Sequence, residues 1–590
     1  MKDLTNQSDK LRKVTLAMYR YPLTTVFLLT ATIIGATSIA QAKDYEKLLL
    51  CCAVGAFLAA LLQVVYERFW NKRVVCFFLM GGGLLLTFGY YLLISVVPTL
   101  RFDVRIRSYI LLGVLAISFL WIPVIQNRIS FNESFMIAFK AFFHAIFYAV
   151  IIFSGCSLII MAIDSLIVPV NAKAYLHIAN LVFVLFAPLF FLSRIPAYPG
   201  KDGDGINLEK NDKKDKEIER AASCPKFLEV LISYILIPIE SGFSVILLLY
   251  IIRSISGDFW TNNRMEPMLI SYAISIIFLY ILSSRINNKF SVFFRLIFPK
   301  ILICIVILQI TSSVIQAYKF GIIYSRYFAI LFGIFAILSG LVMSIAPVQK
   351  NNLIAIMLIV VSLVSILPPI DAFTISQYSQ KTRLKLVLEQ NGMLNDNTII
   401  PNESIEEADK EKIISSVEYL TRMDCTNQIV WMPENFKRYD DFYNTFGFNE
   451  SDLSQKNDWS NVFLKDSLPI DIAGYDILVH TYSNNMESKI CDIHKGKNTY
   501  TLKNQTKENM RLIILVDESN QELIRFNLND IFSKYQKFSN EKTELSMDEA
   551  SFSIENEEAK LMIVVQNATS NRMGDDSDYY MDCYILVHIE

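Results

Sequence analysis

The chain has 590 residues, of which 53% are hydrophobic and 19% are charged, and its formal net charge is −2. This composition is more apolar than that of soluble proteins, and the near-neutral charge argues against a nucleic-acid partner, which would favour a basic surface. The charges are also unevenly placed: long segments before residue 371 carry almost none, whereas the remainder is rich in Lys, Asp, Glu and Asn.

Long apolar segments fill the first 370 residues. A bilayer core of about 30 Å is crossed by about 20 apolar residues in helical conformation. We therefore predict about eleven transmembrane helices, near 22–42, 47–67, 75–97, 107–127, 135–163, 175–194, 226–252, 267–285, 290–315, 322–346 and 351–370. The predicted fold class is a mainly α, polytopic transmembrane bundle over residues 1–370, in contact with the lipid bilayer.

The loops between these segments differ in Lys and Arg content, which predicts their orientation. The N-terminal tail and the loop 195–226 are both rich in Lys and Arg, and six predicted spans separate them. We expect both on the cytoplasmic side of a bacterial inner membrane, with 195–226 as a charged linker. Eleven spans then place residues 371–590 outside the cytoplasm, although Arg101, Arg105 and Arg107 run against the trend.

Ionisable side chains within the predicted spans are the clearest functional candidates, because each costs about 2.5–3.5 kcal/mol at membrane depth and needs a partner or a cavity. Lys140 and His144 lie in the fifth span, Glu240 in the seventh and Lys300 in the ninth. Glu240, His144 and Lys300 each lie roughly 15 Å from the cytoplasmic end of their spans at 1.5 Å per residue. We expect Glu240 to face the bundle interior, within reach of at least one of these cations.

Two prolines accompany these polar positions. Pro238 precedes Glu240 by two residues and Pro299 directly precedes Lys300. A proline inside a helix removes one backbone hydrogen bond and kinks the helix, and broken helices of this kind often build the substrate sites of transporters. The polar residues are therefore either a transport or proton site or a structural ion pair that locks the bundle.

An ordered series of short motifs follows from the seventh span onward. They are Pro225-Lys226-Phe227-Leu228, Ile237-Pro238, Phe259-Trp260, Phe294-Arg295-Leu296-Ile297-Phe298-Pro299, Phe320-Gly321, Arg326-Tyr327, Ser379-Gln380, Arg383-Leu384 and Pro469-Ile470-Asp471-Ile472-Ala473-Gly474-Tyr475. In this order they resemble the bacterial multi-pass membrane family called domain of unknown function 4153, chiefly over residues 225–480. Within them Gly321, Arg326, Tyr327, Asp471, Gly474 and Tyr475 match the family motifs, whereas Gln316 and Ile323 stand where the family has Arg and Thr. The resemblance implies a bacterial inner-membrane protein and assigns no activity.

Residues 371–590 are predicted to form a soluble α+β domain, helical over 371–470 and β-rich, like a β-sandwich, over 471–590. The first helix should run from Ile375 to Leu388, and the second should begin at a capping box of Ser404 and Glu407. Short alternating segments predict strands at 475–483, 498–503, 510–516, 522–526, 551–554, 560–567 and 579–588.

This domain offers little chemistry. Cys425, Cys491 and Cys583 can form one disulfide at most if the domain is extracytoplasmic, and the sequence leaves the pairing open. Cys491 and His494 lack a second ligand pair for zinc, so we expect them in a loop. Because no nucleophile elbow, phosphate-binding loop or dinucleotide motif is present, we predict no catalytic residue, metal or cofactor, and favour a protein that is not an enzyme.

Three functions remain compatible with the sequence. The first is transport of a small solute or ion through a polar site near the membrane midplane. The second is an envelope sensor or assembly factor whose outer β-rich domain binds an envelope protein or small molecule. The third is a glycosyltransferase-like envelope enzyme, but these place a catalytic acid in a long first outer loop, which here spans only Ala42 to Glu46.

Overall fold

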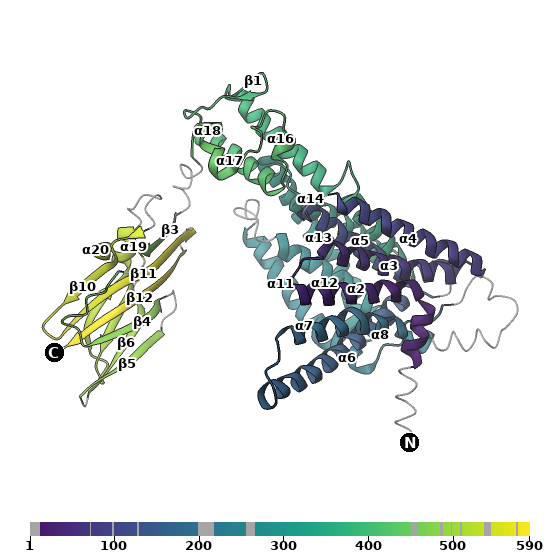
Figure 1. The fold of residues 1–590 in the computed structure, drawn as a ribbon, viewed down its shortest axis with the longest axis horizontal. Helices are drawn as coiled ribbons and strands as arrows, with labels where there is room; N and C mark the ends of the chain where they lie inside the picture. The colour runs from purple at the N-terminus through teal and green to yellow at the C-terminus, as the bar shows by residue number, and fades with distance from the viewer. Residues whose placement is uncertain are drawn as a thin grey trace. The chain divides into compact units, whose positions relative to one another are not determined.

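Figure 1 shows the computed structural model of the chain. It describes residues 12–70, 72–96, 100–126, 129–198, 218–254, 266–449, 458–465, 468–483, 488–496, 498–507, 510–535, 544–573 and 576–590. The contacts divide the chain into two compact units. We call them the membrane unit, which is Met1–Leu384 with Tyr419–Cys425, and the C-terminal unit, which is Lys385–Glu418 with Thr426–Glu590.

The membrane unit contains eleven helical spans, counted over the described residues, that are long and apolar enough to cross a membrane. They are α2 (Pro22–Gln41), α3 (Glu46–Phe69), α4 (Arg73–Ser95), α5 (Phe102–Trp121), α6 (Phe131–Leu166), α7 (Lys173–Ala179) with α8 (Ala187–Arg194), α10 (Lys226–Val230) with α11 (Ile237–Ser254), α12 (Glu266–Ser283), α13 (Lys289–Phe320), α14 (Tyr324–Ile345) and α15 (Asn352–Ile366). This confirms the predicted polytopic bundle and shows a multi-pass membrane protein. Residues 199–217, most of the predicted charged linker, lie outside the described residues.

Polar residues mark where two of the longest helices begin. Ser130 and Glu133 form a capping box at the start of α6, in which each side chain satisfies a free backbone N–H group. The Asn288 side chain accepts a hydrogen bond from the backbone N–H of Ser291 at the start of α13. From there α13 continues unbroken past Pro299 and Lys300 to Phe320.

Two spans change their winding just before a proline. A π-helical segment, Asn180–Phe186, joins α7 to α8, and Pro188 follows it. A second π-helical segment, Leu231–Leu236, joins α10 to α11, and Pro238 follows it in the same relation. Because proline lacks an N–H group and its ring crowds the preceding turn, a wider turn accommodates it, and such π segments often lie at functional sites.

Several apolar cores hold the membrane unit together, and two of them contain most of the buried side chains. The larger joins α10 to α15 around fully buried residues such as Ile232, Ile276 and Leu302. The smaller gathers the first helices with α6 and α8 around Tyr21, Val64 and Leu192. Outside these cores many large apolar side chains are exposed, among them those of α4. Transfer of such side chains from water into lipid is favourable.

The C-terminal unit begins within a helical region that both units share. The helices of this region are α16 (Ala372–Gln390), α17 (Glu407–Arg422) and α18 (Arg438–Phe446). The part of α16 up to Leu384 and the part of α17 from Tyr419 onward belong to the membrane unit. Helix α16 ends two residues beyond the predicted Leu388: Gly392 follows with φ +65°, and the Met393 N–H bonds back to the Leu388 carbonyl. The predicted capping box at Ser404 is wrong, because α17 begins three residues later and the Ser404 N–H binds the Asn402 side chain instead.

Strands β1 (Leu394–Asn395) and β2 (Thr398–Ile399) form a two-stranded sheet after α16, and two larger β-sheets form most of the rest of the C-terminal unit. One has the order β4 (Ile477–Ser483), β12 (Asp576–Ile589), β11 (Ala559–Met573), β3 (Asp458–Leu464) and β9 (Glu544–Leu545), with β10 (Ser551–Glu555) also paired to β11; the other has the order β5 (Ser488–Lys495), β6 (Asn498–Lys507), β7 (Met510–Val516) and β8 (Glu522–Asn527). Their apolar faces share one core, as the predicted β-sandwich-like arrangement requires. The short helices α19 (Leu528–Tyr535) and α20 (Met547–Ala550) lie between strands of these sheets in the chain.

Some strands lack a strong sequence pattern and were not predicted. Strand β5 carries Cys491 and His494, which were expected in a loop and lie instead in an antiparallel pair with β6. Its only fully buried side chain is that of Ile493, so its sequence shows no apolar alternation. All nine cysteines are free, including the three of the predicted soluble domain.

Candidate functional site

Glu240 lies on α11 with its carboxyl group directed toward α12. The residue is 9% exposed, and the Ser275 hydroxyl donates a hydrogen bond of 2.7 Å to its Oε1. One turn further along α11, the Ser244 hydroxyl lies 2.7 Å from the Glu240 backbone carbonyl and 3.0 Å from the Tyr272 hydroxyl. These four residues, the Glu240 cluster, place one carboxyl group among hydroxyl groups inside an apolar core.

The three predicted cationic partners lie elsewhere. The Lys140 ammonium donates a hydrogen bond of 2.6 Å to the Ser223 carbonyl, before the start of α10. His144 and Lys300 are exposed, on the faces of α6 and α13 that turn away from the buried residues of those helices. Among the described residues no Lys, Arg or His lies within ion-pair distance of Glu240, so the structure does not bring the four predicted residues into one site.

The difference has a geometric reason. Counting residues from the end of a span gives depth in the membrane, whereas the direction of a side chain depends on how the helix is rotated about its axis. Lys300 follows Phe298 and Pro299, which are both buried, and the next position around the helix points outward. A long cationic side chain in such a position can extend toward the headgroups while its stem stays in the apolar layer.

A second buried polar group, which sequence reasoning missed, lies between α12, α13 and α14. The α13 polar stripe consists of Gln309, Ser312, Ser313 and Gln316, all at least nine-tenths buried. The Ser313 hydroxyl donates to the Glu266 carboxylate at the start of α12, and the Gln309 amide lies 3.3 Å from Ser313 Oγ. The spacing of three, four and seven residues within an apolar helix was the available signal, since it places all four on one face.

Three family-motif residues meet at the turn between α13 and α14. The Arg326 guanidinium, on a residue 5% exposed, donates a hydrogen bond of 3.0 Å to the Gly321 carbonyl. The Tyr327 hydroxyl donates to the Ile370 carbonyl, just before α16. From α16, the Gln380 amide donates to the carbonyls that flank Gly321, at 3.2 and 3.3 Å. Hydrogen bonds from Tyr327 and Gln380 therefore connect the turn to α16 and to the residue before it.

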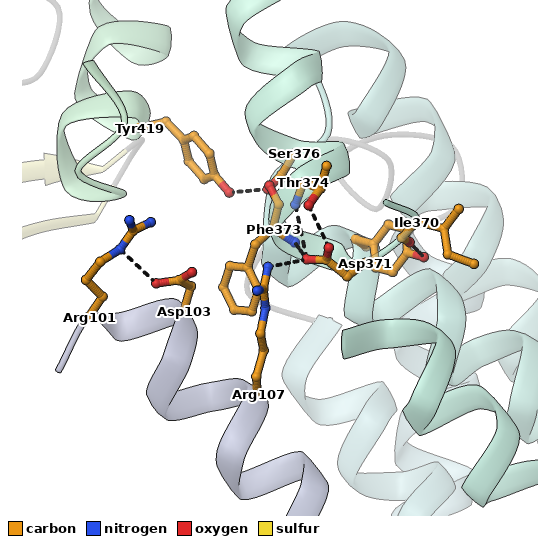
Figure 2. A network of polar contacts seen from close by, with 10 residues as sticks. Arg101, Asp103, Arg107, Ile370, Asp371, Phe373, Thr374, Ser376 and Tyr419 are labelled. Carbon is orange, nitrogen blue, oxygen red and sulfur yellow. Dashed lines mark hydrogen bonds and ion pairs between the residues drawn. The ribbon is translucent and has the colours of Figure 1, made fainter. Parts of the chain in front are cut away.

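Asp371 is the centre of a polar network beside this turn, shown in Figure 2. Its side chain is completely buried, and it forms an ion pair of 2.8 Å with Arg107 of α5. The same carboxylate accepts hydrogen bonds from the backbone N–H groups of Phe373 and Thr374 and from the Thr374 hydroxyl. Asp371 thus caps α16 and links it to α5, and the Arg107 guanidinium also lies over the Phe373 ring at 5.3 Å.

Tyr419 extends the network to the end of α17, which belongs to the same unit (Figure 2). Its hydroxyl donates a hydrogen bond of 2.6 Å to Ser376 and accepts one of 3.1 Å from the Tyr324 N–H at the start of α14. Burial raises the pKa of Tyr419 to about 12, so the hydroxyl stays protonated and remains a donor near neutral pH. These contacts hold α14, α16 and the end of α17 together.

The three arginines that run against the charge asymmetry are all paired with carboxylates. Arg101 binds Asp103 at 3.2 Å, Arg105 binds Glu46 at 2.9 Å, and Arg107 binds Asp371 as described. Their charges are therefore balanced locally.

The remaining motif residues lie in the C-terminal unit. Asp471 accepts a hydrogen bond of 2.9 Å from the Ala473 N–H, and Gly474 adopts φ +81°, so together they shape a tight turn. The ring of the next residue, Tyr475, lies 5.3 Å from the Lys560 ammonium. This arrangement supports a structural role for Asp471 and Gly474 in the turn before β4.

Comparison with known proteins identifies the family. A family model described as a domain of unknown function (DUF4153) matches residues 24–397. The chain belongs to the DUF4153 family. The match spans all eleven transmembrane segments and α16, and it includes Gly321, Arg326 and Tyr327 but not Asp471, Gly474 or Tyr475. No curated protein and no solved structure matches the chain significantly.

The DUF4153 region thus contains both buried polar groups and the part of the Asp371 network that lies on α5, α14 and α16, whereas Tyr419 lies beyond residue 397. The described residues hold no group of three or more His, Cys, Asp or Glu side chains placed to bind a metal ion. Within this region the Glu240 carboxyl group is buried with the Ser275 hydroxyl as its partner. The buried Asp371 carboxylate is matched by an arginine, and Glu266, which also binds a hydroxyl group, is only half-buried.

Proposed function

We propose that this protein is a transporter of the bacterial inner membrane, in which Glu240 takes up a proton or a small monovalent cation during transport of a small solute or ion. The observation that carries the proposal is the buried Glu240 carboxyl, which accepts a hydrogen bond from Ser275 and has no ion-pair partner among the described residues. An ionised carboxylate costs several kcal/mol in an apolar interior, so this group needs a proton or a bound cation.

The helix around Glu240 supports the same function. The π-helical segment Leu231–Leu236 and Pro238 interrupt the regular hydrogen-bond ladder just before Glu240. Freed backbone carbonyls beside a carboxyl group are ligands that cations use in membrane transporters with broken helices. Ser244 and Tyr272 supply further oxygen atoms on the same side.

Glu240→Gln should abolish cation uptake and leave the fold intact. The amide of Gln can still accept the Ser275 hydrogen bond but cannot take up a proton or balance a cation. In liposomes that contain the full chain and a pH-sensitive dye, we expect an imposed negative interior potential to drive proton entry for the wild type and not for Glu240→Gln. The carboxyl reagent dicyclohexylcarbodiimide should modify Glu240 in the wild type, as read by mass spectrometry.

Glu229→Gln, on α10 of the same span, is the matched control and should keep the wild-type flux. Protection of Glu240 from the reagent by Na⁺ would identify a metal cation rather than a proton as the ligand. A Glu240→Gln protein with wild-type flux, particularly one whose thermal unfolding midpoint falls sharply, would assign Glu240 a structural role instead.

We also propose that the N-terminus is cytoplasmic and the domain after residue 371 extracytoplasmic. The Lys and Arg asymmetry of the loops supports this orientation. Arg101, Arg105 and Arg107 run against this asymmetry, and the labelling experiment below therefore decides the orientation.

Labelling of native cysteines tests the orientation. Cys491 is half-buried, whereas Cys425 and Cys583 are buried, and burial raises the pKa of their thiols to about 11 and about 12. Because the thiolate is the reactive form, these two react slowly near neutral pH. A membrane-impermeant maleimide applied to spheroplasts should therefore label mainly Cys491, and Cys491→Ala should remove most of the signal. Labelling that requires permeabilisation would reverse the proposed topology.

A further inference from the structure

One face of the larger sheet in the C-terminal unit carries aromatic and polar side chains where β4, β12, β11 and β3 lie side by side (Figure 1). Val479, Cys583 and Ala568 of these strands pack into the core that the two sheets share. Successive residues of a strand project to opposite faces, so the residues beside these three project away from that core. We call this outer surface the aromatic face; it consists of His480 and Tyr482 of β4, Tyr580, Asp582 and Tyr584 of β12, Asn567 and Thr569 of β11, and Asn461 and Phe463 of β3.

The strand register arranges these side chains in rows, because directly opposed residues on paired strands project from the same face. The central row is Tyr482, Asp582, Asn567 and Phe463, and the row beside it is Tyr580, Thr569 and Asn461. Each row therefore combines an aromatic ring with polar groups across three or four adjacent strands.

The rings of the aromatic face support one another. Tyr482 and Tyr580 stack with their centroids 6.2 Å apart and their planes 25° apart, and the rings of His480 and Tyr584 lie 4.8 Å apart. Tyr482 is nevertheless 59% exposed and Tyr580 44% exposed. Tyrosines held in this way offer a large contact area and lose little conformational freedom when a ligand binds.

Hydrogen-bond acceptors lie between the rings. Asp582 Oδ1 is 2.7 Å from His480 Nε2, and the Thr569 hydroxyl donates a hydrogen bond of 3.1 Å to Asn461 Oδ1. Asn567 Oδ1 is shielded from solvent and has no hydrogen-bond partner among the described residues. A buried acceptor without a donor costs about 1–3 kcal/mol, so a ligand that brings an O–H or N–H group to Asn567 removes that cost.

The charge of the aromatic face favours a neutral ligand. All nine of its residues are described, and none is Lys or Arg. Its carboxylate, Asp582, already has His480 beside it at 2.7 Å. A polyanion would meet Asp582 without any guanidinium or ammonium group to bind it. A protein partner would anchor large side chains in apolar pockets, whereas here the rings alternate with polar groups.

We propose that the aromatic face binds a chain of neutral, β-linked, N-acetylated sugars. Such a sugar ring presents axial C–H groups to one side, and the negatively polarised face of an aromatic ring attracts them. Its hydroxyl and acetamido N–H groups project around the edge of the ring and supply the donors that Asn567 lacks. A β-linked chain is also a flat ribbon, which suits an open sheet face better than a coiled α-linked chain. The proposal does not depend on the role of Glu240.

Saturation-transfer NMR of the full chain in lipid nanodiscs tests this binding, since nanodiscs avoid detergents with sugar headgroups. With tetra-N-acetylchitotetraose as the probe, we expect transfer chiefly to the axial protons on one face of the sugar rings. Cellotetraose, which lacks the acetamido groups, should give weaker transfer, and the α-linked maltotetraose should give none. No transfer to tetra-N-acetylchitotetraose, or equal transfer to all three sugars, would overturn the proposal.

Substitutions place the binding on the aromatic face. Tyr482→Ala with Tyr580→Ala should abolish the transfer, whereas Tyr482→Phe keeps the ring and should retain it. Asn567→Ala should weaken binding about fivefold, the effect of one lost hydrogen bond. Tyr439→Ala on α18, at a residue 91% exposed, is the matched control and should leave the transfer unchanged. Transfer that persists in a folded Tyr482→Ala, Tyr580→Ala chain would overturn the proposal, and an unchanged thermal midpoint would show that this chain is folded.

Discussion

Arg107→Leu should lower the free energy of unfolding of the membrane unit by about 3 kcal/mol, at the low end of the range for breaking a buried ion pair. The replacement leaves the Asp371 carboxylate completely buried without its cation. The three hydrogen bonds from Phe373 and Thr374 remain and limit the loss. Thermal or denaturant unfolding of the purified chain in detergent measures the change.

A second substitution should recover part of this loss. Asn at position 371 can still cap α16 but carries no charge, so Arg107→Leu with Asp371→Asn should be more stable than Arg107→Leu alone. Arg105→Leu is the matched control: its pair with Glu46 is exposed by 40% and 36%, and such pairs contribute about 0–1 kcal/mol. Equal losses from Arg105→Leu and Arg107→Leu would show that burial of Asp371 is not what makes the pair important.

The transmembrane bundle could be predicted from the sequence because two properties of each segment, its length and its apolar content, decide whether it can cross a membrane. Length and apolar content suffice for each span, and even α13, which contains Pro299 and Lys300, remains one helix. Neither quantity predicts the π-helical winding before Pro188 and Pro238, which depends on how the neighbouring turns relieve the proline ring.

In the C-terminal unit, strands with a strong local pattern of apolar residues were predicted, and strands with a weak pattern were missed. Strand β7 contains an apolar run and was predicted at its observed position, and the apolar first half of β11 was predicted while its polar second half, up to Met573, was not. Strand β5 has one fully buried side chain and was missed. The capping-box sequence at Ser404 was misleading because Asn402 binds the Ser404 N–H and holds that segment in a turn, so α17 begins at Glu407.

The sequence did not predict which polar side chains meet in the folded chain. Helix depth placed Glu240 and Lys300 at one level, but the rotation of each helix sends one into the core and the other outward. The link between Arg107 and Asp371 joins residues 264 positions apart, and no local pattern in a single sequence reports such a pair. The family motifs were more informative, because Gly321, Arg326 and Tyr327 do meet at one turn.

Gly321→Ala should destabilise the membrane unit by about 3 kcal/mol, combining backbone strain with lost hydrogen bonds. Gly321 adopts φ +77° and ψ 163°, a region that is essentially restricted to glycine. A Cβ atom there would also lie 2.6 Å from Gln380 Nε2. Gln380 cannot swing away freely, because its amide binds the carbonyls of Phe320 and Ile322.

Combining Gly321→Ala with Gln380→Ala separates the two contributions. Once Gln380 is truncated, the clash disappears, and the remaining difference between Gln380→Ala alone and the double variant should be the backbone strain, about 1–3 kcal/mol. Gly242→Ala, at an α11 position with no atom within 4 Å of the added Cβ, is the control and should be neutral or slightly stabilising. An unfolding midpoint for Gly321→Ala equal to that of Gly242→Ala would mean that the turn can adopt another conformation, and the docking of α16 on it would then not depend on glycine.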